Sequence, residues 1–294
     1  MALTHGLERN SVICTFSDAI STADYQTLTY ERFSDSFMAK NKGLLIYNVP
    51  SPLILEGANK ALAENNLQEF LLAEYGDEHI PVSILHANPS ETSLRDWYSL
   101  GERRPYLKDW HVNRKKRLFR APKLFHEDWL NSEYEFLYWG CEGSSTPRHS
   151  DVLNSFSWSL NLLGVKKWTF YLTSGPVFVY QKSMCAVFVP SGVEHEVENI
   201  SECISVNCNW FNRHNVAKVY TYLIDERNTL IAELCKFGVT WEIDHDQKSD
   251  TIEDMMPAAC GLRITEFMKI LRGQQCPEAE VLMEKIAQEF PHLV

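Results

Sequence analysis

The sequence predicts a mainly β protein with flanking helices, and three observations support this class. Between residues 106 and 210, short runs of aromatic and β-branched residues recur, separated by glycine and proline. After residue 211 the spacing of apolar residues becomes that of helices. The 294 residues are 45% hydrophobic and 12% aromatic, which is enough for a large core. We expect one compound domain in three parts: an N-terminal mixed α/β framing segment (1–100), a β core (101–215) and C-terminal helices (216–294).

The framing segment shows signals of both helix and strand. Residues 58–75 have a helix-like pattern, and residues 80–86 are a strand candidate after a polar turn. Residues 92–97 look like the capped start of a helix. We expect this segment to frame the core rather than to carry the chemistry.

The β core contains six runs of strand-forming residues. They span residues 136–139, 156–163, 167–172, 177–180, 186–189 and 203–210. Many short strands with turn residues between them favour a sandwich or a barrel.

The last part reads as helices over residues 216–234, 264–271 and 278–289. These helices would pack on the β core. The alternative is a subunit interface, which would make the protein a homodimer through its C-terminal helices.

Charge and cysteine content limit the partners and the compartment. The formal net charge of −11 argues against direct nucleic-acid binding, which needs a basic surface. The eight cysteines follow a start without a basic, apolar leader, so we expect reduced thiols and a cytoplasmic location. No apolar run approaches the roughly 20 residues that span a bilayer, so no membrane association is expected. The basic stretch 114–120 would recruit an acidic partner or act as a nuclear address, or is simply a solvated loop.

The strongest chemical signal is the pair His149 and Asp151. On extended backbone, residues two apart point to the same side, so both side chains can reach one metal ion. His195 follows 44 positions later (195 − 151) and would complete a facial triad of two histidines and one carboxylate. A second His-x-Asp, at residues 126–128, weakens the pair taken alone, and we interpret it as a solvated turn. His195 alone would equally fit a hydrogen-bonded histidine at a strand end.

Two further patterns suggest a polar cavity. One face of the run 156–163 and its preceding residue carries small uncharged side chains, namely Ser155, Ser157, Ser159 and Asn161. After Gly164, an inward Lys166 or Lys167 would require a bound anion such as a carboxylate. The alternative is that both lysines lie in water at a turn.

Four motifs together resemble the JmjC family of iron(II)- and 2-oxoglutarate-dependent oxygenases. They are Thr146-Pro147-Arg148-His149-Ser150-Asp151, Gly164-Val165-Lys166-Lys167-Trp168, Phe188-Val189-Pro190-Ser191-Gly192 with His195, and Ser205-Val206-Asn207-Cys208-Asn209-Trp210. The resemblance implies a double-stranded β-helix, a cupin-like jelly roll, for the core. It also implies O₂ as a co-substrate.

The resemblance assigns roles to individual residues. It implies that His149, Asp151 and His195 bind iron(II). It implies that Lys166 pairs with the distal carboxylate of 2-oxoglutarate, helped by the hydroxyls of Tyr106 and Thr146. Asn207 would lie near the chelating end of this co-substrate, with Asn209 a weaker candidate, and Lys108 would face the substrate.

Within the family, residues 106–111, 128–131 and 155–159 look most like a small lysyl hydroxylase of the eukaryotic translation termination factor. This implies hydroxylation of a protein substrate. The same ligand set would also serve an N-methyl-lysine demethylase, and a metal-binding but catalytically silent interaction module is the third reading. The chain departs from the family pattern at Ser183-Met184-Cys185 and Val193, and its short connection between residues 171 and 186 would open the mouth of the site or disturb His195.

Overall fold

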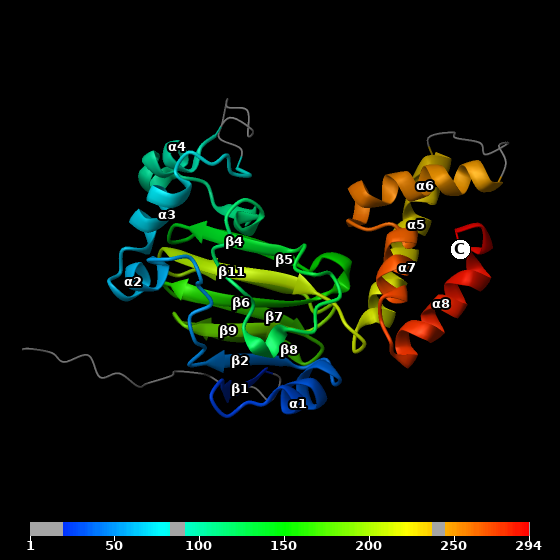
Figure 1. The fold of residues 1–294 in the computed structure, drawn as a ribbon, viewed down its shortest axis with the longest axis horizontal. Helices are drawn as coiled ribbons and strands as arrows, with labels where there is room; N and C mark the ends of the chain where they lie inside the picture. The colour runs from blue at the N-terminus through cyan, green and yellow to red at the C-terminus, as the bar shows by residue number, and fades with distance from the viewer. Residues whose placement is uncertain (1–19, 83–91, 237–244, 294) are drawn as a thin grey trace, which may run out of the picture.

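The fold is a mainly β, jelly-roll-like core with a C-terminal helical region, which confirms the predicted class (Figure 1). The computed structural model describes residues 20–82, 92–236 and 245–293. One sheet has seven strands in the order β1-β2-β9-β6-β11-β4-β3, and the other has four in the order β5-β10-β7-β8. The strands are β1 (Ile20–Asp24), β2 (Gly43–Tyr47), β3 (Leu107–Trp110), β4 (Glu135–Gly140), β5 (Ser145–His149), β6 (Phe156–Leu163), β7 (Lys166–Leu172), β8 (Gly175–Gln181), β9 (Cys185–Val189), β10 (His195–Asn199) and β11 (Cys203–Trp210).

All six predicted strands form, and two of them, β6 and β11, have the predicted bounds. Their side chains alternate between two environments. Phe156, Trp158 and Leu160 of β6 join the main apolar core cluster, which also includes residues of the N-terminal helices. The intervening Ser157 and Ser159 line a cavity. A strand buried on both faces therefore positions the polar site.

The two sheets also pack against each other through a smaller apolar cluster. Leu45 and Val187 come from the seven-stranded sheet, and Phe170, Val179 and Val197 come from the four-stranded sheet. β6 and β7 meet at Gly164, which has φ +83°, and a Cβ there would lie 2.0 Å from the carbonyl oxygen of Glu202. Only glycine fits this turn.

The N-terminal framing segment adds two strands that the sequence did not predict. β1 pairs in parallel with β2, and β2 pairs antiparallel with β9. Its helices are α1 (Tyr30–Phe33), α2 (Ala58–Ala63), α3 (Leu67–Tyr75) and α4 (Leu94–Ser99). Ser93 caps α4 as predicted, accepting a hydrogen bond from the backbone N–H of Asp96.

One predicted helix of the framing segment is wrong in detail. The pattern over residues 58–75 is two helices, α2 and α3, because Asn65 between them has φ +56°. Asparagine tolerates this left-handed conformation better than most residues, so the chain can turn there. The strand candidate at residues 80–86 lies largely outside the described residues.

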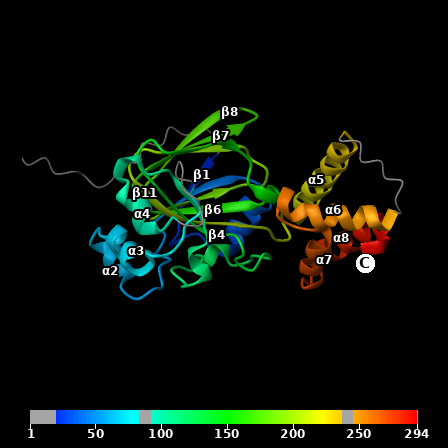
Figure 2. The same ribbon diagram turned by 90° about the horizontal axis from the view of Figure 1, so that it is seen from above.

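The C-terminal helices lie to one side of the strands in both views (Figures 1 and 2). They are α5 (Val216–Lys236), α6 (His245–Cys260), α7 (Ile264–Arg272) and α8 (Pro277–Glu289). Their apolar faces share one cluster with Trp129, Leu153 and Phe211 of the β core. The helices therefore pack on the core, while the homodimer through them stays a prediction. In the described ranges, no helix is both long and apolar enough to cross a membrane, and none of the seven described cysteines forms a disulfide.

Candidate active site

His149 and His195 face each other across two neighbouring strands. His149 ends β5, His195 begins β10, and the two residues are direct partners in the antiparallel register. Their ring centroids lie 4.4 Å apart. His195 therefore starts a strand of its own, six positions beyond the end of the preceding apolar strand β9, whereas the sequence predicted it at the end of that strand.

The backbone fixes which nitrogen of each imidazole is free. Nδ1 of His149 lies 2.8 Å from the carbonyl oxygen of Pro147, and Nδ1 of His195 lies 3.0 Å from that of Val193. A carbonyl oxygen only accepts hydrogen bonds, so Nδ1 carries the proton and Nε2 keeps its lone pair. Burial lowers the pKa of His195 by more than the Asp151 carboxylate raises it. This favours the neutral imidazole that a metal needs.

Asp151 completes a cluster suited to a metal ion. It follows β5 on extended backbone, with φ −63° and ψ 148°. One ligand atom of each of His149, Asp151 and His195 lies within 4.8 Å of the others. The Ser157 hydroxyl donates to Oδ2 of Asp151 at 2.7 Å, which leaves Oδ1 as the open oxygen. Two imidazoles and one carboxylate match the facial-triad donor set.

The cluster lies in a cavity of about 290 Å³ between the two sheets. Its lining contains most of the residues proposed from the sequence, among them Lys108, Thr146, His149, Asp151, His195, Asn207 and Asn209. Trp168 forms part of the wall, stacked on the His195 ring with centroids 5.5 Å apart. The site is thus partly enclosed by aromatic side chains.

Lys166 is the buried lysine, with 2% of its surface exposed, whereas Lys167 points outward toward Glu198 at 3.9 Å. The Lys166 Nζ donates to the Ser205 hydroxyl at 2.7 Å and to the Tyr106 hydroxyl at 3.3 Å. No Asp or Glu of the described ranges pairs with it. Burial lowers the pKa of Lys166 to about 8. A buried cation held only by neutral hydroxyls calls for an anion.

Other polar groups around the cavity differ in whether they already make hydrogen bonds. The Asn207 Nδ2 donates to the Ser205 hydroxyl at 3.2 Å, and the Asn209 Nδ2 donates to the Ser155 hydroxyl at 3.2 Å. The Ser159 hydroxyl lines the cavity, is buried and has no hydrogen-bond partner within the described chain. Buried polar atoms are nearly always paired, so this hydroxyl is available to a polar ligand. Thr146 lines the cavity without a described bond to Lys166.

The second His-x-Asp lies elsewhere and has structural roles. His126 is exposed, and its ring packs against Tyr30 with centroids 4.4 Å apart. Asp128 accepts hydrogen bonds from the backbone N–H groups of Leu130 and Ser132, both at 2.8 Å. Burial raises the pKa of Asp128 to about 6. The triplet forms a turn outside the metal cluster, and Asp128 is more buried than a solvated turn would be.

The basic stretch 114–120 is largely neutralised by acidic side chains of the same chain. Lys115 pairs with Glu78 at 2.8 Å, and Arg117 lies 3.8 Å from Glu135. Lys116 pairs with Glu74. These ion pairs make the stretch part of the folded surface rather than a free basic loop.

Sequence reasoning missed Ser205 and part of the cavity wall. Ser205, which accepts the hydrogen bond of Lys166, shares a face of β11 with Asn207 and Asn209, so strand alternation could have identified it. Tyr134, Phe136 and Tyr138 form an aromatic wall at alternate positions along β4 and the residue before it. The same alternation was visible in the sequence. Asp109 could not have been found, because its placement depends on an irregularity in β3.

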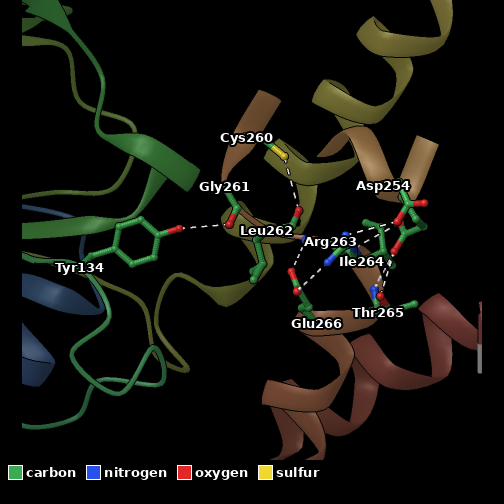
Figure 3. A network of polar contacts seen from close by, with 10 residues as sticks. Tyr134, Asp254, Cys260, Gly261, Leu262, Arg263, Ile264, Thr265 and Glu266 are labelled. Atoms are coloured by element: carbon green, nitrogen blue, oxygen red, sulfur yellow. Dashed lines mark hydrogen bonds and ion pairs between the residues drawn. The ribbon is translucent and has the colours of Figure 1, made fainter. Parts of the chain in front are cut away.

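The aromatic wall reaches the C-terminal helices. The Tyr134 hydroxyl donates to the carbonyl oxygen of Gly261, at 3.2 Å, in the loop between α6 and α7 (Figure 3). Gly261 has φ +87°, and a Cβ there would lie 2.8 Å from the Tyr134 hydroxyl. Next to it, Arg263 binds Glu266 and Asp254 and holds the loop in place (Figure 3).

The fold and the site define a class: a jelly-roll-like protein with a two-histidine, one-carboxylate cluster beside a buried lysine. Comparison with curated proteins identifies relatives of that class. The Gallus gallus and Homo sapiens proteins named 2-oxoglutarate and iron-dependent oxygenase JMJD4 are 28% and 29% identical to this chain, over 69% and 75% of its length. The Drosophila melanogaster homologue of the same name is 34% identical over 56% of the chain. The chain is therefore a homologue of the JmjC-domain proteins named JMJD4, which confirms the resemblance.

The match covers only part of these relatives. It spans 62% of the Gallus gallus protein, 67% of the Homo sapiens protein and 47% of the Drosophila melanogaster protein. A protein of Arabidopsis thaliana named arginine-specific demethylase JMJ20 is 26% identical over 67% of the chain. This match spans 58% of the Arabidopsis thaliana protein. No family model matches the chain. Among solved structures, a cupin superfamily protein of Desulfitobacterium hafniense aligns with 28% of the chain at 14% identity and a TM-score of 0.24.

Proposed function

We propose that this chain is an iron(II)- and 2-oxoglutarate-dependent oxygenase that hydroxylates a lysyl side chain of a protein. The observation that carries the proposal is a metal-type cluster in a cavity, with a buried lysine behind its wall: Lys166 lacks an acidic partner in the described ranges and reaches Asn207 of the lining through the Ser205 hydroxyl. The names of the JMJD4 relatives support iron and 2-oxoglutarate as the two cofactors.

The donor set fits iron(II). His149 and His195 present Nε2, and Asp151 presents Oδ1, as argued from their hydrogen bonds. Three protein ligands on one side of a metal leave positions open for a co-substrate and O₂. Ser157 and the two backbone carbonyls keep the ligands oriented.

The polar groups behind Asn207, beside the cavity, suit the far end of a dicarboxylate. Lys166 would pair with the distal carboxylate of 2-oxoglutarate, and the hydroxyls of Tyr106 and Ser205 would hold the lysine in place. Asn207 and the unpartnered Ser159 hydroxyl would bind the same molecule nearer the metal. Thr146 lies in the same lining and would add a hydroxyl.

Iron(II) and 2-oxoglutarate, when bound, supply the chemistry that reduces O₂, converts 2-oxoglutarate to succinate and CO₂, and adds an oxygen atom to a C–H bond of the substrate. The residues of this chain bind and orient both groups. Trp168 and the aromatic wall would shield the reacting atoms from part of the solvent. The protein thus contributes mainly positioning.

The proposed substrate is a lysyl residue of the eukaryotic translation termination factor. The support is the resemblance of residues 106–111, 128–131 and 155–159 to the lysyl hydroxylase of that factor. N-methyl demethylation is the second candidate, because a relative from Arabidopsis thaliana is named an arginine-specific demethylase. Both reactions need the same metal ligands.

The deciding experiment combines the purified chain with iron(II), ascorbate, 2-oxoglutarate and the recombinant termination factor. We expect succinate formation and a mass increase of about 16 Da, one oxygen atom, on the factor. Formaldehyde released from methylated lysine or arginine peptides, with no gain of oxygen, would instead favour demethylation. One equivalent of bound iron without succinate, even with candidate substrates present, would mean a catalytically silent metal-binding module.

Matched variants test the ligand assignment in the same assay. His149→Ala and Asp151→Ala should abolish succinate formation and weaken iron binding. His126→Ala removes a histidine of the other His-x-Asp triplet and should do neither, because that ring packs against Tyr30 outside the cluster. Equal damage from His126→Ala and His149→Ala would overturn the assignment.

A further inference from the structure

We propose that Asp109 is a specificity-determining residue, whose carboxylate binds the positive charge of the substrate side chain at the mouth of the cavity. The inference rests on the proposed function and deepens it. It assigns the selection of a cationic side chain to one residue outside the metal and co-substrate sites.

Asp109 owes its position to an irregularity in β3. The register between β3 and β4 shifts between Leu107 and Trp110. Asp109, inside this shift, has φ +56°. A non-glycine residue in the left-handed region costs free energy and is enriched at binding sites. Such bulges re-aim side chains, and here Asp109 joins the lining of the cavity.

The carboxylate of Asp109 accepts a hydrogen bond but has no positively charged partner among the described residues. The Tyr138 hydroxyl donates to its Oδ1 at 2.7 Å. No lysine, arginine or histidine of the described ranges forms an ion pair with it, and the residue is exposed. Oδ2 therefore remains open to a cation that enters the cavity from solvent.

The aromatic wall beside Asp109 favours the same class of ligand. The ring centroids of Tyr134 and Phe136 are 6.3 Å apart, as are those of Phe136 and Tyr138. All three side chains line the cavity. Ring faces attract ammonium and guanidinium groups, and their apolar surface accommodates an aliphatic stem. Carboxylate and rings together suit the side chain of lysine or arginine.

Lys108 is the other charged residue at the mouth that could select the substrate side chain. It lines the same cavity and would favour an acidic side chain. However, Lys108 is half-buried, and its Nζ lies 5.9 Å from the centroid of the Tyr106 ring. Of the two charged residues, Asp109 is the more exposed.

The test compares pools of seven-residue peptides with randomised flanks and a fixed central residue. Lysine is compared with norleucine, arginine with citrulline, and glutamate with glutamine. The variant is Asp109→Asn, which removes the charge but keeps an acceptor for Tyr138 and tolerates the left-handed backbone. The matched control is Glu142→Gln, which removes an exposed charge outside the cavity lining.

Two readouts are taken with iron(II) and 2-oxoglutarate present: succinate formed with each pool, and anisotropy of fluorescently labelled pools under nitrogen. In the wild type and in Glu142→Gln, the lysine and arginine pools should exceed their uncharged partners, and glutamate should not exceed glutamine. In Asp109→Asn the ratio of the signal from a cationic pool to that from its uncharged partner should fall roughly tenfold, as expected for a lost charge-assisted hydrogen bond. Because the ratio is taken within each variant, general damage to the protein cancels.

The outcomes separate the two proposals. An unchanged ratio in Asp109→Asn, or no preference in the wild type, would overturn the role of Asp109. A preference of the wild type for glutamate over glutamine would assign the mouth to Lys108 instead. If no succinate forms with any pool or with the termination factor, the proposed function fails, while anisotropy still decides whether Asp109 selects cationic side chains.

Discussion

At the residue scale, single hydrogen bonds determine which atoms face the cavity. Ser157 occupies Oδ2 of Asp151, so the other carboxylate oxygen is the one directed to a metal. Loss of such an outer contact typically weakens metal binding about 10–100-fold. We therefore expect Ser157→Ala to reduce affinity for iron(II) or Mn(II) by about this factor, measured by anaerobic titration.

A serine of the β7–β8 turn provides the control for this prediction. Ser174 is exposed and remote from the cavity lining, so Ser174→Ala should leave the affinity unchanged. If Ser157→Ala bound iron(II) as tightly as the wild type, the carboxylate would be oriented by something else.

Lys166 predicts a pH dependence of co-substrate binding. Its pKa is lowered to about 8 by burial, and only the protonated ammonium attracts a carboxylate. The dissociation constant of 2-oxoglutarate should therefore be constant below pH 8 and rise roughly tenfold per pH unit above it, as one proton is lost. Isothermal titration between pH 7 and pH 9.5 measures it.

Lys166→Arg separates charge from geometry in this experiment. The guanidinium stays protonated throughout this pH range. The affinity of the variant for 2-oxoglutarate, although lower than that of the wild type at pH 7, should therefore not fall further above pH 8. Lys166→Met should bind weakly at every pH. A wild-type affinity that is flat up to pH 9.5 would show that the co-substrate does not depend on this lysine.

Residue identities could be predicted from the sequence where local periodicity decided them. Alternation along a strand marks the polar face of Ser157 and Ser159, and it leaves one of two adjacent lysines facing inward. Spacing alone could not choose between Lys166 and Lys167, and only the family resemblance did so. Asp109 depends on a backbone dihedral and a register shift that no local pattern encodes.

At the scale of elements, the six predicted strand runs include neither of the two strands nearest the metal cluster, although His149 was expected on extended backbone. β5 contains Pro147 and is an edge strand, where proline is tolerated because no ladder N–H is needed. β10 has the sequence His-Glu-Val-Glu-Asn, with little apolar character. Both strands are held by pairing with neighbours distant in sequence, so local composition could not reveal them.

Gln181 at the end of β8 connects the two sheets through three hydrogen bonds. Its Oε1 accepts from the Trp168 indole at 2.8 Å, and its Nε2 donates to the carbonyl oxygens of Ser159 and Cys185 at 2.7 and 2.8 Å. Gln181→Met keeps the volume but removes three hydrogen bonds, among them the one to the buried Trp168 indole N–H. At about 1 kcal/mol each, we expect the free energy of unfolding to fall by about 3 kcal/mol.

Urea denaturation followed by tryptophan fluorescence measures this loss. Gln26→Met, at an exposed position, is the control and should change stability by less than about 0.5 kcal/mol. A Gln181→Met protein as stable as the wild type would mean that these three bonds contribute nothing net to stability.

At the scale of the whole molecule, the C-terminal helices and the β core share one apolar cluster. Phe267 of α7 is fully buried, with its ring centroid 5.7 Å from that of Phe211 and 6.2 Å from that of Tyr220. Phe211 directly follows β11, the strand that carries Asn207. We therefore expect the helices and the core to unfold in a single transition.

Phe267→Ala tests this coupling. Truncating a buried phenylalanine costs about 3–5 kcal/mol, so the unfolding midpoint should fall markedly. Helical circular dichroism and tryptophan fluorescence should shift together. Val281→Ala, at a position that is 63% exposed on α8, should shift neither. Two separate transitions in Phe267→Ala would show that the helices fold independently of the core.

The sequence could predict where most of the C-terminal helices lie along the chain but not how they meet the core. Helical periodicity located α5, α7 and α8 closely, because each presents an apolar face. The surface that receives those faces combines Trp129, Leu153 and Phe211, which come from three separate segments. Only the folded chain brings these three segments together.

The hydrogen bond between Tyr134 and Gly261 connects the helical region to the aromatic wall of the cavity. The loop that accepts this bond is itself fastened by Arg263, Glu266 and Asp254. A change in the position of this loop would therefore reach the cavity through a side chain of its lining, without involving a metal ligand.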